Sequence, residues 1–144
     1  MIQRTLQTIF CDDIRHETTG KLTLVGVYSD SLVVSTLPAT LPRLCLVARL
    51  LSPRNEAPSA VKLRAFRGEE LLQEVVANEI AQPTRKPTDN TRVQIVQFLV
   101  EFPSFEIAAP CLLRVHAEVD GREIYGAPLN IQVMQTAGAT TTLQ

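Results

Sequence analysis

The chain has 144 residues, of which 14 are basic and 15 acidic, and a formal net charge of -1. This length predicts one domain over residues 1–134, followed by a flexible C-terminal tail at residues 135–144. Because no basic excess can drive counterion release, the charge balance argues against nucleic acid and anionic membranes as main partners.

The first predicted element is a β-hairpin. Two strand-like runs, Leu6–Ile14 and Leu22–Tyr28, flank the polar, glycine-containing segment His16–Lys21. Turn-forming residues between two apolar runs are typical of a hairpin. Its second strand is apolar on both faces, so we expect that strand to be covered on both sides and the hairpin to form the centre of a sheet. Pairing about the turn places Gly26 opposite Cys11.

Two adjacent carboxylates, Asp12 and Asp13, lie within the first of these strands. Successive side chains of a strand point to opposite faces, so the two carboxylates cannot both point outward from a regular strand. One interpretation is structural: one carboxylate is solvated, and the other bonds to Arg15, Arg49 or backbone N–H groups. A partner-binding surface is a second interpretation.

A metal site is the third interpretation of the same segment. His16 and Glu17 follow Asp12 and Asp13 closely, and imidazole and carboxylate groups are common metal ligands. A strand would divide these ligands between its two faces, which works against the metal site. A calcium-dependent sandwich would instead need several carboxylates from loops that meet at one end of the molecule. The aspartates in predicted loops are Asp30, Asp89 and Asp120.

The remaining predicted strands follow a short turn at 28–31. They are Leu32–Ser35, Arg43–Leu51, Val61–Phe66, Leu71–Ala77, Arg92–Phe102, Cys111–Val119, Arg122–Tyr125 and Leu129–Met134. The segment Leu37–Pro42 carries two prolines, which a central strand does not accommodate, so we expect a crossover to another sheet or edge there. Asp120-Gly121 predicts a tight hairpin turn.

Three other segments are less regular. Leu71–Ala77 also fits a helical stripe, but the run before it and the Gly68 turn favour a strand. Gln82–Thr91 has two prolines and no apolar residue, which predicts an exposed loop. Pro103–Pro110 is expected to bridge two strands. Eight or nine short strands separated by proline and glycine turns together predict an antiparallel, immunoglobulin-like β-sandwich.

The hairpin and the segment after it carry a resemblance. The motif F-C-D-D-I-R-H-E at Phe10–Glu17, with Gly20-Lys21 and Gly26-Val27-Tyr28 in the second half of the hairpin, resembles an uncharacterised family of small bacterial and phage-associated β-proteins. The resemblance covers roughly Ile9–Pro42. Residues Pro103–Val133 are similar only to the closing strands of immunoglobulin-like domains. The family carries no established activity, so the resemblance implies a fold and no reaction.

Residues that support common chemistries are few. The chain has three cysteines and two histidines, and no motif of a serine hydrolase, zinc peptidase, phosphate-binding loop or C-x-x-C pair. Cys11, Cys45 and Cys111 each lie in an apolar run, which favours small buried side chains over ligands or nucleophiles. His116 alternates with charged residues and is expected on a solvated sheet face. The N-terminus lacks a signal-peptide pattern, so we expect a cytoplasmic protein, or a virion-associated one if a phage encodes it.

These observations favour a non-enzymatic protein-interaction or assembly module, with no cofactor, as a phage-associated structural or accessory protein. The expected partners are proteins, in a homo-oligomer or a larger assembly. The alternative is a metal protein or an enzyme that uses Asp12, Asp13, His16 and Glu17. The candidate polar cluster consists of Asp12, Asp13, Arg15, His16, Glu17 and Lys21.

Overall fold

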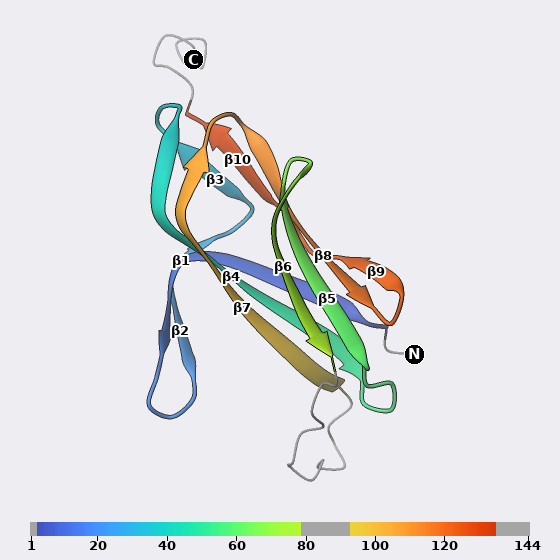
Figure 1. Ribbon diagram of the computed structural model, residues 1–144. Coiled ribbons are helices and arrows are strands. Elements are labelled where there is room, and N and C mark those ends of the chain that lie inside the picture. Colours follow the sequence, from blue (N-terminus) through green and yellow to red (C-terminus); the bar gives the residue numbers. More distant parts are fainter. Residues whose placement is uncertain (1–2, 79–92, 135–144) are drawn as a thin grey trace, which may run out of the picture.

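The computed structural model describes residues 3–78 and 93–134, and these residues form strands and connecting turns only (Figure 1). Ten strands are present within them, where eight or nine were expected. In chain order they are β1 (Thr5–His16), β2 (Leu22–Tyr28), β3 (Ser31–Val34), β4 (Ala39–Pro53), β5 (Ala60–Arg67), β6 (Glu70–Asn78), β7 (Val93–Ile107), β8 (Cys111–Val119), β9 (Arg122–Tyr125) and β10 (Leu129–Val133). None of the described residues belongs to a helix that could cross a membrane. The predicted loop Gln82–Thr91 and tail Gln135–Gln144 lie outside the described residues.

The strands form two sheets. The first has four strands in the order β2-β1-β4-β7, and the second has six, β3-β10-β8-β5-β6 with β9 paired to β8. All pairs are antiparallel except β3 and β10, which run parallel, so the expectation of a purely antiparallel fold is wrong at this edge. Residues 35–128 separate these two strands. No hairpin turn therefore dictates their relative direction.

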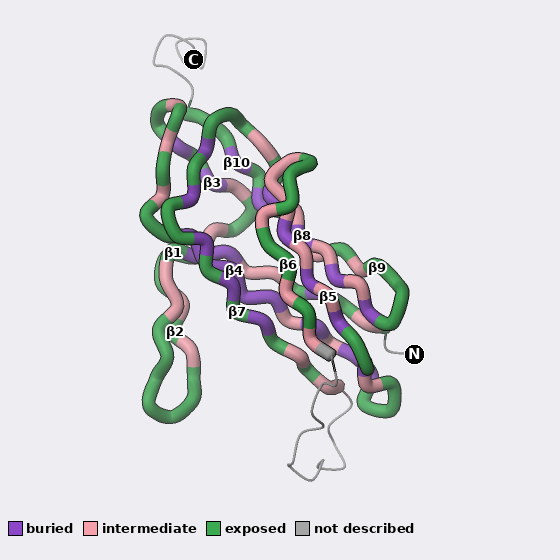
Figure 2. Tube along the Cα trace, viewed as in Figure 1, coloured by how far each residue is buried: buried purple, intermediate pink, exposed green. Residues whose placement is uncertain are grey.

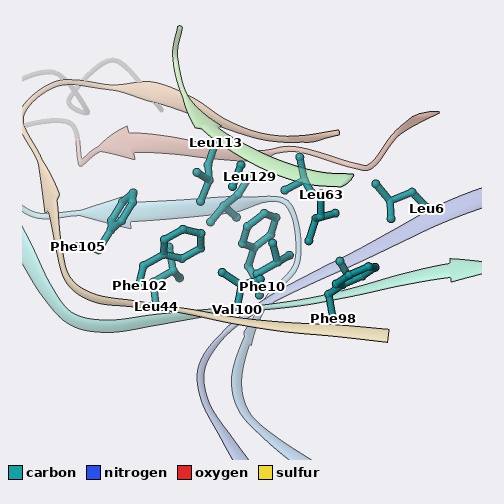
Figure 3. Packing of buried hydrophobic residues seen from close by; sticks show 14 of the residues in the cluster. Leu6, Phe10, Leu44, Leu63, Phe98, Val100, Phe102, Phe105, Leu113 and Leu129 are labelled. Carbon is teal, nitrogen blue, oxygen red and sulfur yellow. The ribbon is translucent and has the colours of Figure 1, made fainter. Parts of the chain in front are cut away.

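A single apolar core lies between the two sheets (Figure 3). Alternate residues of β4 point into it, namely Leu44, Leu46, Ala48 and Leu50, and all of them are buried. Phe10, Phe98 and Phe102 extend from the same sheet toward Leu63, Leu113 and Leu129 of the other (Figure 3). Complete burial of one such side chain contributes about 1.5–3 kcal/mol, so the two facing layers account for the all-β sandwich architecture.

The hairpin is present, but it does not form the centre of a sheet. Pairing of β1 with β4 ends at Cys11 and Cys45, whereas pairing of β1 with β2 continues to His16 and Leu22. The outer half of the hairpin therefore projects beyond the sandwich (Figures 1 and 2). No residue of β2 is buried, so the expected cover on both sides is wrong, because the second sheet does not extend this far.

The predicted pairing of the hairpin is also shifted by one residue. Cys11 pairs with Val27, which leaves Gly26 opposite Asp12. The turn closes with the Glu17 N–H on the Lys21 carbonyl at 2.8 Å, so it contains one more residue than a turn centred on 18–19 would have. Gly26 has a φ of 69°, a left-handed conformation in which glycine is favoured.

Two strands run further than expected. β4 begins at Ala39, inside the predicted crossover, and β7 continues to Ile107, inside the predicted bridge. The chain does change sheets between β3 and β4, but it resumes pairing before Pro42. Arg43 pairs with Pro103 after β1 has already left β4, so this end of β4 has only one neighbour. A proline is tolerated there because one edge of the strand has no neighbouring strand that would need its backbone N–H as a hydrogen-bond donor.

β6 confirms the strand interpretation of Leu71–Ala77 over the helical one. It pairs antiparallel with β5, and the Arg64 Nε lies 2.8 Å from Glu74 Oε2 on the directly opposite residue. The Asp120-Gly121 turn between β8 and β9 is also confirmed, with positive φ angles of 48° and 86°. The turns at Gly68 and at Asp120-Gly121 were thus predicted correctly from local sequence.

Candidate functional site

The two carboxylates of the hairpin point to opposite faces of β1. Asp12 lies on the same face as Phe10, and its Oδ1 accepts a hydrogen bond from the Tyr28 hydroxyl at 2.6 Å. An ideal Cβ on Gly26 would lie 2.1 Å from Asp12 Oδ2, so the glycine makes room for this carboxylate. The contact joins the two strands of the hairpin at the point where it leaves the sandwich.

Asp13 points to the other face and takes part in an ion network. Its Oδ1 accepts hydrogen bonds from Arg43 Nη1 at 2.6 Å and from the Ile14 N–H at 3.0 Å. The Arg43 Nε lies 2.9 Å from Glu101 Oε1, so the network joins β1, β4 and β7. The hydrogen bond from Arg43 holds the pKa of Asp13 below its usual value. Arg15 lies 3.8 Å from the same carboxylate.

The other candidates of the polar cluster lie at the tip of the hairpin and do not join the aspartates. Glu17 Oε1 accepts a hydrogen bond from the Thr23 hydroxyl at 2.7 Å, and His16 is the last residue of β1, paired with Leu22. Lys21 takes part in closing the turn through its backbone carbonyl. Among residues 3–78 and 93–134, no three His, Cys, Asp or Glu side chains gather closely enough to hold a metal ion.

A more extended feature is the outer face of the four-stranded sheet, the face turned away from the core. It contains the odd-numbered residues of the paired parts of β1, β2 and β4 and, up to Glu101, of β7. The register forms rows across it: Val27–Cys11–Cys45–Glu101 and Ile9–Val47–Leu99. Cys11, Cys45 and Val47 are buried although they lie outside the core cluster.

Toward both edges of the outer face, apolar side chains are open to solvent. The exposed fractions are 37% for Val25 and 56% for Val27 on β2, and 46% for Ile95 and 40% for Leu99 on β7. No segment within the described part of the chain covers these four side chains. Apolar surface that is contiguous with buried apolar positions is typical of an interaction surface. Figure 2 shows that the hairpin is mostly exposed, whereas the strands in the body of the sandwich contain buried residues.

The surroundings of the three cysteine thiols make them poor nucleophiles. Burial raises the pKa of the Cys11 thiol to about 11 and also raises the pKa of Cys45 and of Cys111. The thiolate is the nucleophilic form, so a raised pKa leaves very little of it at neutral pH. Cys11 and Cys45 act as small apolar residues of the outer face, in agreement with the interpretation of their sequence context.

His116 was expected on a solvated sheet face, but its side chain is partly buried between the rings of Phe66 and Tyr125. Its ring centroid is 5.2 Å from that of Phe66 and 4.5 Å from that of Tyr125. Burial lowers the pKa of His116, and the nearby Arg114 lowers it further, so the neutral imidazole is favoured. The residue packs on β8 as an aromatic side chain.

Sequence reasoning missed Arg43 and the exposed apolar residues of the outer face. It proposed Arg15 or Arg49 as partners of the acidic doublet, whereas Arg43 makes the short contact and Arg49 lies in the row between Gln7 and Gln97. Alternation along β7 could have indicated Ile95 and Leu99. The register between β1 and β4, which alone places Arg43 beside Asp13, joins segments 30 residues apart and has no local signal.

These features define a class of protein: an all-β chain of two facing sheets, with a projecting hairpin and exposed apolar side chains toward both edges of one outer sheet face. The chain belongs to a family of unknown function, DUF6941, which matches residues 7–132. The match extends from β1 to β10 and so includes the hairpin and both sheets. A comparison with curated proteins found no match.

Proposed function

We propose that the protein is a non-enzymatic interaction or assembly module, which binds a protein partner on the outer face of the four-stranded sheet. The observation that carries the proposal is the exposure of Val25 and Val27 at the base of a hairpin whose outer half projects from the sandwich. Burial of an apolar side chain by a partner contributes about 25 cal/mol per Å² of surface removed from water. A projecting hairpin can reach into a partner without disturbing the core.

The geometry of the hairpin also supports this proposal. A two-stranded ribbon alone is marginally stable in water. Here the contacts Asp12–Tyr28 and Asp13–Arg43 hold its base, and Thr23–Glu17 holds its tip. These polar contacts order the hairpin before a partner binds, so less conformational entropy is lost on binding.

The test compares capture of proteins by three tagged versions of the chain in extract of the organism that encodes it. The first is the unmodified chain, the second carries Val25→Lys and Val27→Lys, and the third carries Leu71→Lys. Leu71 is a matched control, because it is an equally exposed apolar residue on β6 of the other sheet. We expect the unmodified and Leu71→Lys chains to enrich the same proteins and the hairpin variant to lose them. Equal enrichment by all three chains would contradict the proposal.

The finer assignments belong to the same proposal. The C-terminal part of the chain supports an immunoglobulin-like sandwich: β8 is followed by the tight Asp120-Gly121 turn, and the last strand, β10, pairs with β8. Association with a phage or prophage-like particle rests on the sequence resemblance, and a cytoplasmic location is the alternative. Gradient centrifugation of native extract separates these cases: sedimentation with large particles supports the first, and recovery in the fraction of small soluble proteins supports the second.

A further inference from the structure

The free edges of the two sheets are protected to different degrees. An uncovered edge strand presents unpaired N–H and C=O groups, and proteins usually protect it with charges, kinks, prolines or short length. β3 and β9 have only four residues each. β2 is kinked at Gly26, with its positive φ, and β6 carries Glu70 and Glu74.

β7 is the exception among the described strands. Its neighbour on one side is β4, and no described strand pairs with its other side. Pro103 and Ser104, which has a φ of 51°, protect its last third. Residues 93–102 contain no proline, glycine, lysine or arginine, and their single charge, Glu101, is paired with Arg43 at 2.9 Å. This stretch is a long, regular edge with one charged side chain.

We propose that residues 93–101 of β7 pair antiparallel with the same residues of a second copy of the chain, about a two-fold axis at Gln97. This inference rests on the proposed role in assembly and names one of the partners. The two four-stranded sheets would join into one continuous sheet of eight strands. The outer faces of the two copies would become a single surface.

The sequence of β7 is complementary to itself about this axis. Gln97 then lies opposite Gln97 of the partner subunit, where two amide side chains can exchange hydrogen bonds. Leu99 lies opposite Ile95 of the partner subunit, and Phe98 lies opposite Val96 of the partner subunit. Apolar pairs and pairs of an aromatic with a β-branched residue stabilise adjacent strands. No like charges meet, whereas self-pairing of β6 about Leu72 would place Glu70 opposite Glu74 of the partner subunit.

The exposed side chains and the length of the strand fit a second copy as the occupant. Ile95 and Leu99 are the exposed apolar residues of β7 on the outer face, and pairing about Gln97 covers both of them. Nine residues of strand span about 30 Å. We expect pairing along an edge of that length to bury less surface than the roughly 800 Å² per partner of a standard interface, so the dimer should be weak, with a dissociation constant in the micromolar range.

A cysteine cross-link tests the register. In the proposed pairing the two copies of residue 97 are directly opposite, with Cα atoms about 4.5–5.5 Å apart, within the range that a disulfide requires. Oxidised glutathione would convert two Gln97→Cys thiols into one disulfide and release two molecules of reduced glutathione. The matched control is Leu99→Cys, whose two copies would be separated by four residues of strand, about 13 Å. The unmodified chain controls for Cys11, Cys45 and Cys111.

We expect the Gln97→Cys variant to form a disulfide-linked dimer, measured by mass spectrometry without reductant, while the Leu99→Cys variant and the unmodified chain form no disulfide-linked dimer. Equal yields from the two variants, or a dimer from Leu99→Cys alone, would overturn the proposed register.

Sedimentation velocity between about 1 and 500 μM tests the dimer without cysteines. Gln97→Lys places two like charges opposite each other on the axis and should abolish association. Gln7→Lys adds the same charge on β1 in the same row of the outer face, and should dimerise as the unmodified chain does. A monomeric unmodified chain, or a Gln97→Lys variant that dimerises equally well, would overturn the inference.

The outcomes for the dimer and for the hairpin proposal can be told apart. A monomeric chain that still captures partners through Val25 and Val27 would overturn the dimer inference alone. A dimer that captures no partner would support the dimer inference and contradict the hairpin proposal.

Discussion

The two halves of β1 are held in different ways. From Thr5 to Cys11 the strand has β4 beside it, and Leu6 and Phe10 point into the core. From Asp12 to His16 only β2 pairs with it, and polar side-chain contacts replace apolar packing between sheets. Burial of apolar surface is the dominant stabilising term in folding, so one continuous strand passes from the most stable part of the molecule to a less stable one.

The largest expected effect comes from a cavity in the body of the sandwich. Leu46 is fully buried and pairs with Phe10, so Leu46→Ala should lower the free energy of unfolding by about 2–5 kcal/mol. Leu24 on the hairpin is only half-buried, and Leu24→Ala should lower it by about 1 kcal/mol. Chemical denaturation of both variants measures the difference. Equal losses would show that the hairpin belongs to the same cooperative unit as the core.

Gly26→Ala should have the next largest effect, and it acts on the hairpin alone. The new Cβ would clash with the Asp12 carboxylate, and φ at this position is 69°, so the change should cost about 1–2 kcal/mol. Asp12 must then move away from Tyr28. We therefore expect Tyr28→Phe to be nearly neutral once Gly26→Ala is present, as measured by a double-mutant cycle. Additive losses would mean that Asp12 keeps its hydrogen bond.

The hairpin, most strands and the Asp120-Gly121 turn could be predicted because each depends on a local pattern. The shift of one residue in the first hairpin arose because the length of its turn depends on backbone hydrogen bonds, which composition does not reveal. Where strands end was harder to predict. Prolines marked Leu37–Pro42 and Pro103–Pro110 as connections, yet Ala39–Pro42 and Pro103–Ile107 pair with each other. The prolines are tolerated because β1 no longer pairs with β4 there.

The candidate site was predictable only in part. The division of Asp12 and Asp13 between two faces follows from the geometry of a strand. The partner of Asp13 does not, since Arg43 reaches it through the pairing of distant strands. The uncovered outer face depends on which strands become neighbours, and that is set by packing of the whole chain.

The contact between Tyr28 and Asp12 should have a smaller effect than Gly26→Ala. Burial and then the hydrogen bond to Asp12 raise the pKa of Tyr28 to about 12. Asp12→Ala removes the hydrogen bond and keeps much of the burial, so the pKa should fall only part of the way toward its usual value of about 10. The loss of stability should be about 0.5–1.5 kcal/mol. Ultraviolet absorbance of a Tyr125→Phe background, in which Tyr28 is the one tyrosine, measures the titration. An unchanged pKa would show that burial alone causes the shift.

The smallest expected effect is a local opening of the hairpin in acid, without a matching change in the body. The pKa of Asp13 is lowered by its hydrogen bond from Arg43, so the folded state favours the carboxylate. The stabilisation is therefore complete above the usual aspartate pKa of about 3.9 and is lost as the pH falls through the lower pKa of the folded state. Hydrogen-exchange protection of β2 amides should decrease between pH 6 and pH 3, more than that of β4 amides near Leu46.

Two variants separate this effect from general acid destabilisation. Arg43→Gln removes the partner of Asp13, so the decrease in protection with acid should become smaller in β2. Asp120→Asn is the matched control: the pKa of Asp120 is lowered by its hydrogen bond from the Ser59 side chain, at the β8–β9 turn far from the hairpin. It should leave the pH dependence of β2 unchanged. If β2 amides respond to acid alike in all three chains, the Asp13–Arg43 pair does not hold the base of the hairpin. The two halves of β1 would then differ in apolar packing alone.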